Sequence, residues 1–160
     1  MPAEIRKITL SEDCKKIAVS YATASPTTVV LKDQNEVEVT LTSEEFTYAA
    51  GVLSFEYTHT VPLIGVVQVL PKNAEGVTLT PAYSVATCKI NCCIGTLLHE
   101  MLEYNCKCDK CKEELVRLEK IYLLLQAAVY EAENTANLTQ AVKNYNKASE
   151  LCVQVCACGC

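Results

Sequence analysis

Short runs in which apolar and polar side chains alternate occupy the first half of the chain. The alternation is clearest over residues 17–21 and recurs over 37–41 and 53–57. Successive side chains of a β-strand point to opposite faces, so each run predicts a strand with one buried face. Polar turn residues separate the runs, and two segments rich in β-branched residues, 27–30 and 66–69, predict further strands.

Strands at this spacing predict an antiparallel β-sandwich. About seven strands near ten residues apart are typical of an immunoglobulin-like sandwich. The run 61–70 has little polar alternation, so it is expected in the middle of a sheet, and residues 76–85 are expected to form the closing strand. The Cys…Trp…Cys pattern of antibody domains is missing, because the sequence has no Trp. Strand count alone does not fix the topology, so an unrelated small barrel is the alternative.

From Lys89 onward the apolar residues recur every three or four positions, which is the period of a helix. This predicts a short helix that ends near Asn105, a long helix over 109–134 and a last helix that begins near Leu138. The polar turn between the last two is so short that they must run antiparallel. In the long helix, a packing seam of coiled-coil type is predicted at Leu115, Leu118, Tyr122, Leu125 and Val129.

These patterns together predict an α+β protein. An antiparallel, immunoglobulin-like β-sandwich is expected at residues 1–88. A cysteine-rich helical hairpin, or three-helix segment, is expected at 89–160.

Composition and charge narrow the possible partners. The formal net charge of −5 offers no basic patch for a phosphate backbone, so no direct contact with nucleic acid is expected. The longest apolar runs fall far short of the roughly 20 residues that a membrane-spanning helix needs, so no membrane segment is expected. The first ten residues lack the apolar run of a secretory signal, and synthesis in a cytoplasm is expected.

The sequence also lacks the residue patterns of common enzymes. Neither a Ser–His–acid set, nor a glycine-rich phosphate loop, nor a pair of acids at catalytic spacing is apparent. His59 follows Phe55 and Tyr57 in the same alternation and is expected to be a packed residue at a strand end. The chain is therefore expected to be non-enzymatic.

Cysteine is the unusual feature of the composition. The sequence has 11 cysteines, and all except Cys14 lie between Cys88 and Cys160. Cys111 and Gly159 lie at equal distances before and after Thr135, the expected centre of the hairpin turn. An antiparallel hairpin would therefore bring together two clusters at its open end, which comprise Cys106, Cys108, Cys111, Cys156, Cys158 and Cys160.

Three chemistries suit such a cysteine clamp. Four of the thiolates, two from each cluster, would form a tetrahedral site for zinc or another thiophilic metal. Disulfides would join the same clusters in an oxidising medium. Free thiols are the third alternative, with Cys152 and others acting as small buried apolar residues. At the domain junction, Cys88, Cys92 and Cys93 are placed to tie the sandwich to the helices.

Several features recur together in one known group of proteins. They are the opening segment 8–11 (ITLS), a closing strand that runs into a cysteine-containing helix over 85–93, and the segments 108–111 (CDKC) and 145–148 (YNKA) before a cysteine-rich end. In these features the chain resembles small virion-associated proteins encoded by tailed bacteriophages, crAss-like phages among them. The resemblance implies a structural role in the virion, as an oligomer in the neck, tail or capsid surface that packs against other virion proteins. It also implies assembly in the cytoplasm of the bacterial host.

Two other classes of function remain open at this point. One is a host metal-binding or thiol-redox protein that uses the C-terminal cysteine clusters, for which labile metal and low-pKa thiols are expected. The other is a cell-surface adhesin module with an immunoglobulin-like fold, which the missing signal peptide disfavours.

Overall fold

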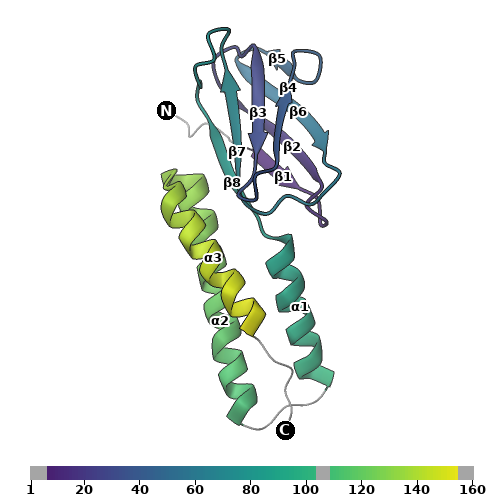
Figure 1. The fold of residues 1–160 in the computed structure, drawn as a ribbon, viewed down its shortest axis with the longest axis vertical. Coiled ribbons are helices and arrows are strands. Elements are labelled where there is room, and N and C mark those ends of the chain that lie inside the picture. The colour runs from purple at the N-terminus through teal and green to yellow at the C-terminus, as the bar shows by residue number, and fades with distance from the viewer. Residues whose placement is uncertain (1–6, 104–108, 155–160) are drawn as a thin grey trace. The chain divides into compact units, whose positions relative to one another are not determined.

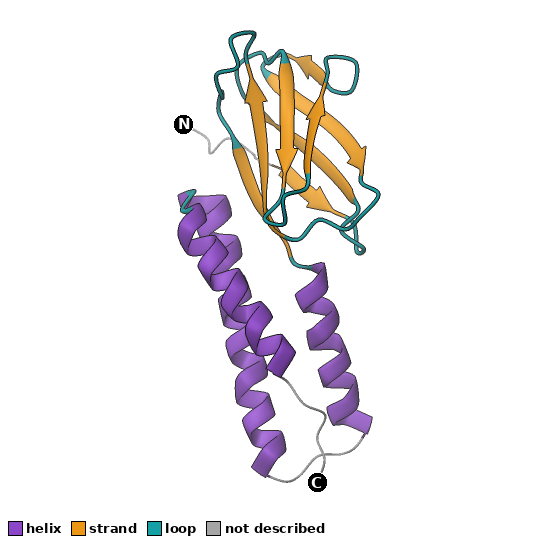
Figure 2. Ribbon diagram, viewed as in Figure 1, coloured by secondary structure: helices purple, strands orange, loops and turns teal. Residues whose placement is uncertain are grey.

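The computed structural model describes residues 7–103 and 109–154. The chain divides into two compact units, Met1–Ala86 and Thr87–Cys160. Strands belong to the first unit and helices to the second, as the orange and purple segments of Figure 2 show. The chain is therefore of mixed α+β class with its helices in the C-terminal half, which confirms the prediction at this level. The division falls after Ala86, whereas the sequence placed it after Cys88.

The first unit consists of two antiparallel four-stranded sheets (Figure 1). One sheet has the strand order β1-β2-β6-β5 and the other has the order β4-β3-β7-β8. The bounds of the eight strands are β1 (Lys7–Leu10), β2 (Lys16–Ala22), β3 (Thr28–Lys32), β4 (Glu38–Leu41), β5 (Thr47–Ala49), β6 (Val52–Thr58), β7 (Gly65–Lys72) and β8 (Ala82–Ala86).

The predicted alternation sets which face of each strand is buried. In β2, Ile17, Val19 and Tyr21 are buried and their neighbours are not. In β6, Leu53 and Phe55 follow the same rule, and Phe55 lies directly opposite Val19 in the antiparallel ladder. Side chains that alternate in this way place one apolar face of the sheet in the core.

The strand β7 is central, as predicted, since it pairs with β3 on one side and β8 on the other. The closing strand is shorter than predicted, and β8 covers only its last part. The reason is a tight turn just after β7, in which the Asn73 side chain accepts hydrogen bonds from the N–H groups of Glu75 and Val77 at 3.0 and 2.9 Å. Gly76 supplies the left-handed backbone that this turn needs, with φ of 79°.

A second glycine begins β7. Gly65 has φ of 70°, and a Cβ atom at this position would collide with the side chain of Gln34. That side chain is held in place because its Oε1 accepts a hydrogen bond from the Val66 N–H at 3.2 Å. The site therefore excludes a side chain both by backbone conformation and by space.

The second unit contains α1 (Cys88–Glu103), α2 (Asp109–Tyr130), the π-turn η1 (Glu131–Thr135) and α3 (Leu138–Gln154). These bounds lie close to those predicted. Ala136 breaks the helix with a left-handed φ of 52°, and Asn137 caps α3 by accepting a hydrogen bond from the Gln140 N–H at 3.2 Å. The long helices α2 and α3 lie side by side (Figure 1). Within the described ranges, no helix has the length and apolar character needed to cross a membrane.

The seam of the hairpin differs from the one predicted. Leu118 and Leu125 are buried as expected, but Leu115 and Tyr122 are exposed by 51% and 52%. The buried positions of α2 and η1 recur at alternating steps of four and three residues and comprise Glu114, Leu118, Ile121, Leu125, Ala128 and Ala132. Facing helix α3 buries Ala141, Tyr145 and Ala148. Small alanines on both helices allow the two backbones to approach closely. The buried face of α2 is therefore rotated about the helix axis from the predicted face.

Candidate functional site

Most of the predicted cysteine clamp lies outside the described residues. This holds for Cys106, Cys108, Cys156, Cys158 and Cys160. Cys111 belongs to the N-terminal part of α2, and its side chain is also outside the described set. Over the part of the chain that the structure describes, no three His, Cys, Asp or Glu side chains are grouped to hold a metal ion. The zinc site therefore stays a prediction.

A different cysteine pair is joined within the helical unit. Cys93 of α1 and Cys152 of α3 form a disulfide, with their Cα atoms 6.2 Å apart. Cys93 was expected to tie the sandwich to the helices, and Cys152 was considered as a buried thiol. The disulfide instead connects the first and last helices of the second unit. The reason is that Cys93 lies between Ile90 and Leu97, which are both buried, and so on the face by which this helix packs.

The neighbouring Cys92 is exposed and carries a free thiol. Its position next to Cys93 in a helix turns its side chain away from the face that carries the disulfide. The helical unit therefore combines a half-buried disulfide with an accessible thiol one residue away.

The exposed side of α2 carries several large apolar side chains. Five large side chains are exposed there, which we call the α2 stripe: Leu115, Val116, Tyr122, Leu123 and Tyr130. At 100° per residue, Val116, Leu123 and Tyr130 lie opposite the buried seam, and Leu115 and Tyr122 lie beside it. The exposed fractions reach 57% and 58% for Leu123 and Tyr130. Two of these residues, Leu115 and Tyr122, were predicted in the seam because they recur there at steps of three and four residues.

A carboxylate at the N-terminal end of the seam was also missed. Glu114, near the start of α2, is only 5% exposed. Its Oε1 lies 3.9 Å from the Arg117 guanidinium, and its Oε2 has no hydrogen-bond partner among the described residues. The seam pattern of three- and four-residue steps includes this position, which is the signal that could have identified it.

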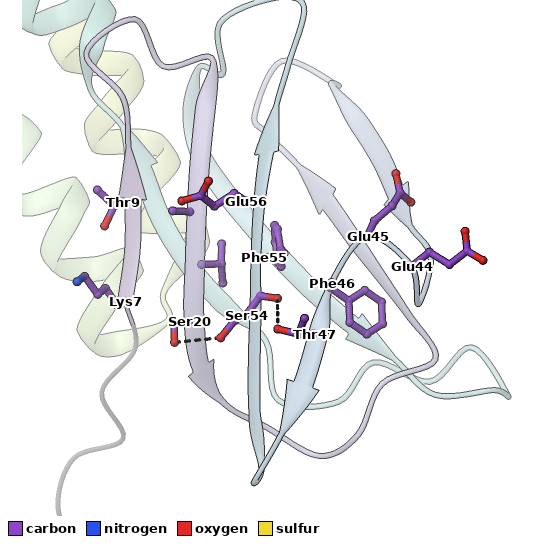
Figure 3. Close-up of a pocket in the computed structure, with 12 residues that line it drawn as sticks. Lys7, Thr9, Ser20, Glu44, Glu45, Phe46, Thr47, Ser54, Phe55 and Glu56 are labelled. Atoms are coloured by element: carbon purple, nitrogen blue, oxygen red, sulfur yellow. Dashed lines mark hydrogen bonds between the residues drawn. The ribbon is translucent and has the colours of Figure 1, made fainter.

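The first unit has a shallow pocket on the sheet β1-β2-β6-β5, with a volume of about 480 Å³. Figure 3 shows Ser20, Ser54 and Thr47 in a row across β2, β6 and β5. The Ser54 hydroxyl lies 3.3 Å from the Ser20 hydroxyl, and the Thr47 hydroxyl donates to the Ser54 carbonyl at 3.3 Å. Small hydroxyl side chains therefore form the floor of this pocket.

Acidic residues dominate the rim of the pocket. Glu44, Glu45 and Glu56 lie there with one lysine, Lys7. Glu45 accepts hydrogen bonds from the N–H and hydroxyl of Thr42 at 2.8 and 3.2 Å and so closes its own turn. The residues that line the pocket include neither a histidine nor a cysteine. The pocket therefore presents hydroxyl groups on its floor and carboxylates on its rim.

His59 is a packed residue, as the sequence predicted. It follows β6, is 6% exposed and lies edge-on to the Tyr57 ring at 4.7 Å between ring centroids. Burial lowers the pKa of its imidazole below the ordinary value, and the Asp33 carboxylate opposes this shift. Its Nε2 has no hydrogen-bond partner in the part of the chain described here.

Asp33 is buried nearby and has a structural role. Its Oδ1 accepts hydrogen bonds from the N–H groups of Asn35 and Val37 at 2.9 and 3.0 Å, and its Oδ2 accepts one from Ile64 at 2.8 Å. These bonds tie the β3–β4 turn to the segment before β7. The acid is fully used in holding the backbone, so the pair with His59 does not form an acid–base site.

Comparison with protein-family models, with curated proteins and with solved structures finds no match for this chain.

Proposed function

We propose that this chain is a non-enzymatic structural protein that acts by assembly, as an oligomeric component of a tailed-bacteriophage virion. The observation that carries the proposal is the α2 stripe, an apolar surface that a helix leaves exposed over several turns. Contiguous exposed apolar surface of this kind is typical of sites that bind another protein. The likeness of the sequence to small virion-associated proteins supports the particle as the place of assembly, in the neck, tail or capsid surface.

The first unit supports this role as an immunoglobulin-like domain. We infer this from its strand order, with β1, β2, β6 and β5 corresponding to strands A, B, E and D of such domains. Strands β3, β7 and β8 then correspond to C, F and G, and β4 is an extra edge strand beside C. Domains of this architecture commonly serve recognition at surfaces, which fits a module that contacts other virion proteins.

The test is mass spectrometry of virions purified from the phage that encodes the chain. A structural component is expected in every preparation at a constant ratio to the major capsid protein. Particles from a deletion mutant provide the control, and they should lose the peptide signal together with a step of assembly or infection. A chain found in infected cells but absent from purified particles would contradict the proposal.

A host metal-binding or thiol-redox protein is the second candidate. The exposed free thiol of Cys92, adjacent in sequence to the disulfide-bonded Cys93, favours it. Such a protein is expected to have a low-pKa thiol or a labile metal. Alkylation of the purified chain with iodoacetamide across pH, with elemental analysis of bound metal, tests this. A thiol that reacts only above about pH 8, as an ordinary thiol does, with no bound metal would exclude this candidate.

A further inference from the structure

The α2 stripe has a pattern that identifies its partner. Leu115, Val116, Tyr122, Leu123 and Tyr130 are exposed, and the half-buried Val129 extends the same surface. The stripe spans residues 115–130, which is about 24 Å of helix at 1.5 Å per residue.

The apolar positions of the stripe are self-complementary. If two copies of α2 lie antiparallel about a twofold axis midway between Tyr122 and Leu123, each apolar side chain lies at the same height as an apolar side chain of the second copy, with Glu119 and Gln126 nearest the contact line and Tyr122 and Leu123 flanking it. The pairs at equal height are Leu115 with Tyr130, Val116 with Val129, and Tyr122 with Leu123. One surface that matches itself in this way is what a twofold-symmetric dimer requires.

The polar positions on the same face obey the same register. Glu119 comes opposite Gln126, whose amide can donate to a carboxylate, and Lys112 comes opposite Glu133. A parallel pairing would instead place Lys112 against Lys112 and Glu133 against Glu133, which like-charge repulsion disfavours. Lys112 and Glu133 also have interactions within their own chain, and the experiment below separates the two effects.

We propose that two copies of the chain associate through the α2 stripe, antiparallel, with Tyr122 and Leu123 at the centre of the interface. A single pair of helices of this length buries an area at the lower end of specific interfaces, below about 1,200 Å² in total. The dimer should therefore be reversible and form in the micromolar range. The proposal deepens the oligomeric role proposed above by naming its surface, but it concerns the isolated chain and does not depend on a virion.

The first measurement is sedimentation velocity of the full chain over a concentration series. Free thiols are capped with iodoacetamide, so that disulfides between copies cannot form and Cys93–Cys152 stays intact. The expected result is a monomer–dimer transition. Tyr122→Asp and Leu123→Asp should each raise the dissociation constant at least about tenfold, because they bury an unpaired charge at the centre of the interface. Val77→Asp is the matched control, since Val77 is 56% exposed in the first unit, and it should leave the transition unchanged.

Charge exchange tests the register. Lys112→Glu alone and Glu133→Lys alone should each weaken dimerisation, because both place like charges at each end of the interface. A mixture of the two variants should restore it in a mixed dimer, since at each end a carboxylate of one variant then faces an ammonium group of the other. Loss of an interaction within one chain cannot be repaired by mixing. A mixture no tighter than either variant alone would overturn the antiparallel register.

Two further outcomes would overturn the proposal as a whole. One is a wild-type chain that stays monomeric at every concentration. This outcome overturns the proposal whether the chain itself covers the stripe, which hydrogen exchange would show as protection, or leaves it open to another partner. The other is a dimer that Leu123→Asp leaves unchanged. Either result leaves the virion proposal standing if the chain is still found in purified particles, so failures of the two proposals are distinguishable.

Discussion

The two units of this chain handle their apolar residues differently. In the β unit, the large apolar side chains of both sheets turn inward, and the exposed ones are Val52, Val61 and Val77, which belong to three separate segments of the chain. In the helical unit, a single helix exposes five large apolar side chains on one side while it buries a seam on the other. In the first unit, buried Asp33 holds a loop by hydrogen bonds, and in the second a disulfide joins α1 to α3.

The difference shows what each unit needs in order to be stable. Two facing sheets bury both inner faces, so the β unit is complete within one chain. A hairpin of two helices can bury only one stripe of each helix, and a third helix or a second copy must cover the rest. The disulfide compensates for part of this deficit because it limits the freedom of the unfolded helical segment.

The largest expected effect tests which side of α2 is its core. Ile121 is fully buried, so Ile121→Ala should lower the free energy of unfolding of the helical unit by about 2–5 kcal/mol. Leu115→Ala is the matched control and should change it by less than about 0.5 kcal/mol at concentrations where the chain is monomeric. Urea unfolding followed by circular dichroism at the helical band measures both. Equal losses would show that the seam is assigned to the wrong face.

The next effect concerns the disulfide between α1 and α3 of the helical unit. Replacement of both Cys93 and Cys152 by alanine should destabilise this unit by about 2–4 kcal/mol, since the bond closes a long loop. The β unit, with its own core, should unfold as before. Cys92→Ala is the control and should have no effect on stability, because its thiol is free and exposed. Retained helical stability in the double variant would mean that packing alone holds α1 against α3.

A pair of glycines compares the two units directly. Gly65→Ala should destabilise the β unit by about 1–3 kcal/mol, because alanine is strained at positive φ and its Cβ would displace Gln34. Gly95 lies in α1 with open space around it, so Gly95→Ala should stabilise the helical unit by about 0.5–1 kcal/mol. Thermal melts of both variants measure whether the melting temperature falls for Gly65→Ala and rises for Gly95→Ala. A Gly65→Ala variant as stable as the wild type would contradict the tight fit at the start of β7.

The smallest effect is a pH dependence confined to the β unit. Burial keeps His59 neutral by lowering its pKa, whereas in the unfolded chain it takes up a proton near its ordinary value of about 6.5. Its contribution to stability is therefore fully present above that pH and is lost as the pH falls below it. His59→Leu should flatten the decline in melting temperature between about pH 7 and 5.5. His99→Gln, in the helical unit, is the control, and an unchanged slope in His59→Leu would assign the decline to other groups.

Local patterns alone determined most of the elements. The alternation at Ile17, Val19 and Tyr21 predicted both a strand and its buried face, because a pleated strand repeats every two residues whatever its surroundings. The change to a period of three and four, with the polar turn before Asn137, predicted α2 and α3 within a few residues of their bounds.

The seam of α2 shows what local sequence patterns cannot predict. Leu118 and Leu125 belong to two frames of three- and four-residue steps, one through Leu115 and Tyr122, the other through Ile121 and Ala128. The first was predicted from its three- and four-residue spacing, which the second frame shares. The folded hairpin uses the second, because alanines on α2 and α3 let the backbones approach and leave the bulky side chains outside. Only the partner helix could decide between the two frames.

The pairing of segments that are distant in the sequence could likewise not be predicted from it. The division of strands between two sheets and the disulfide between Cys93 and Cys152, 59 residues apart, depend on how distant segments meet. The sequence by itself determined the type of each element, because dihedral preference and side-chain period act within a few residues. The tertiary structure decided which faces are buried in the hairpin and which cysteines bond, because packing selects among frames of equal local quality.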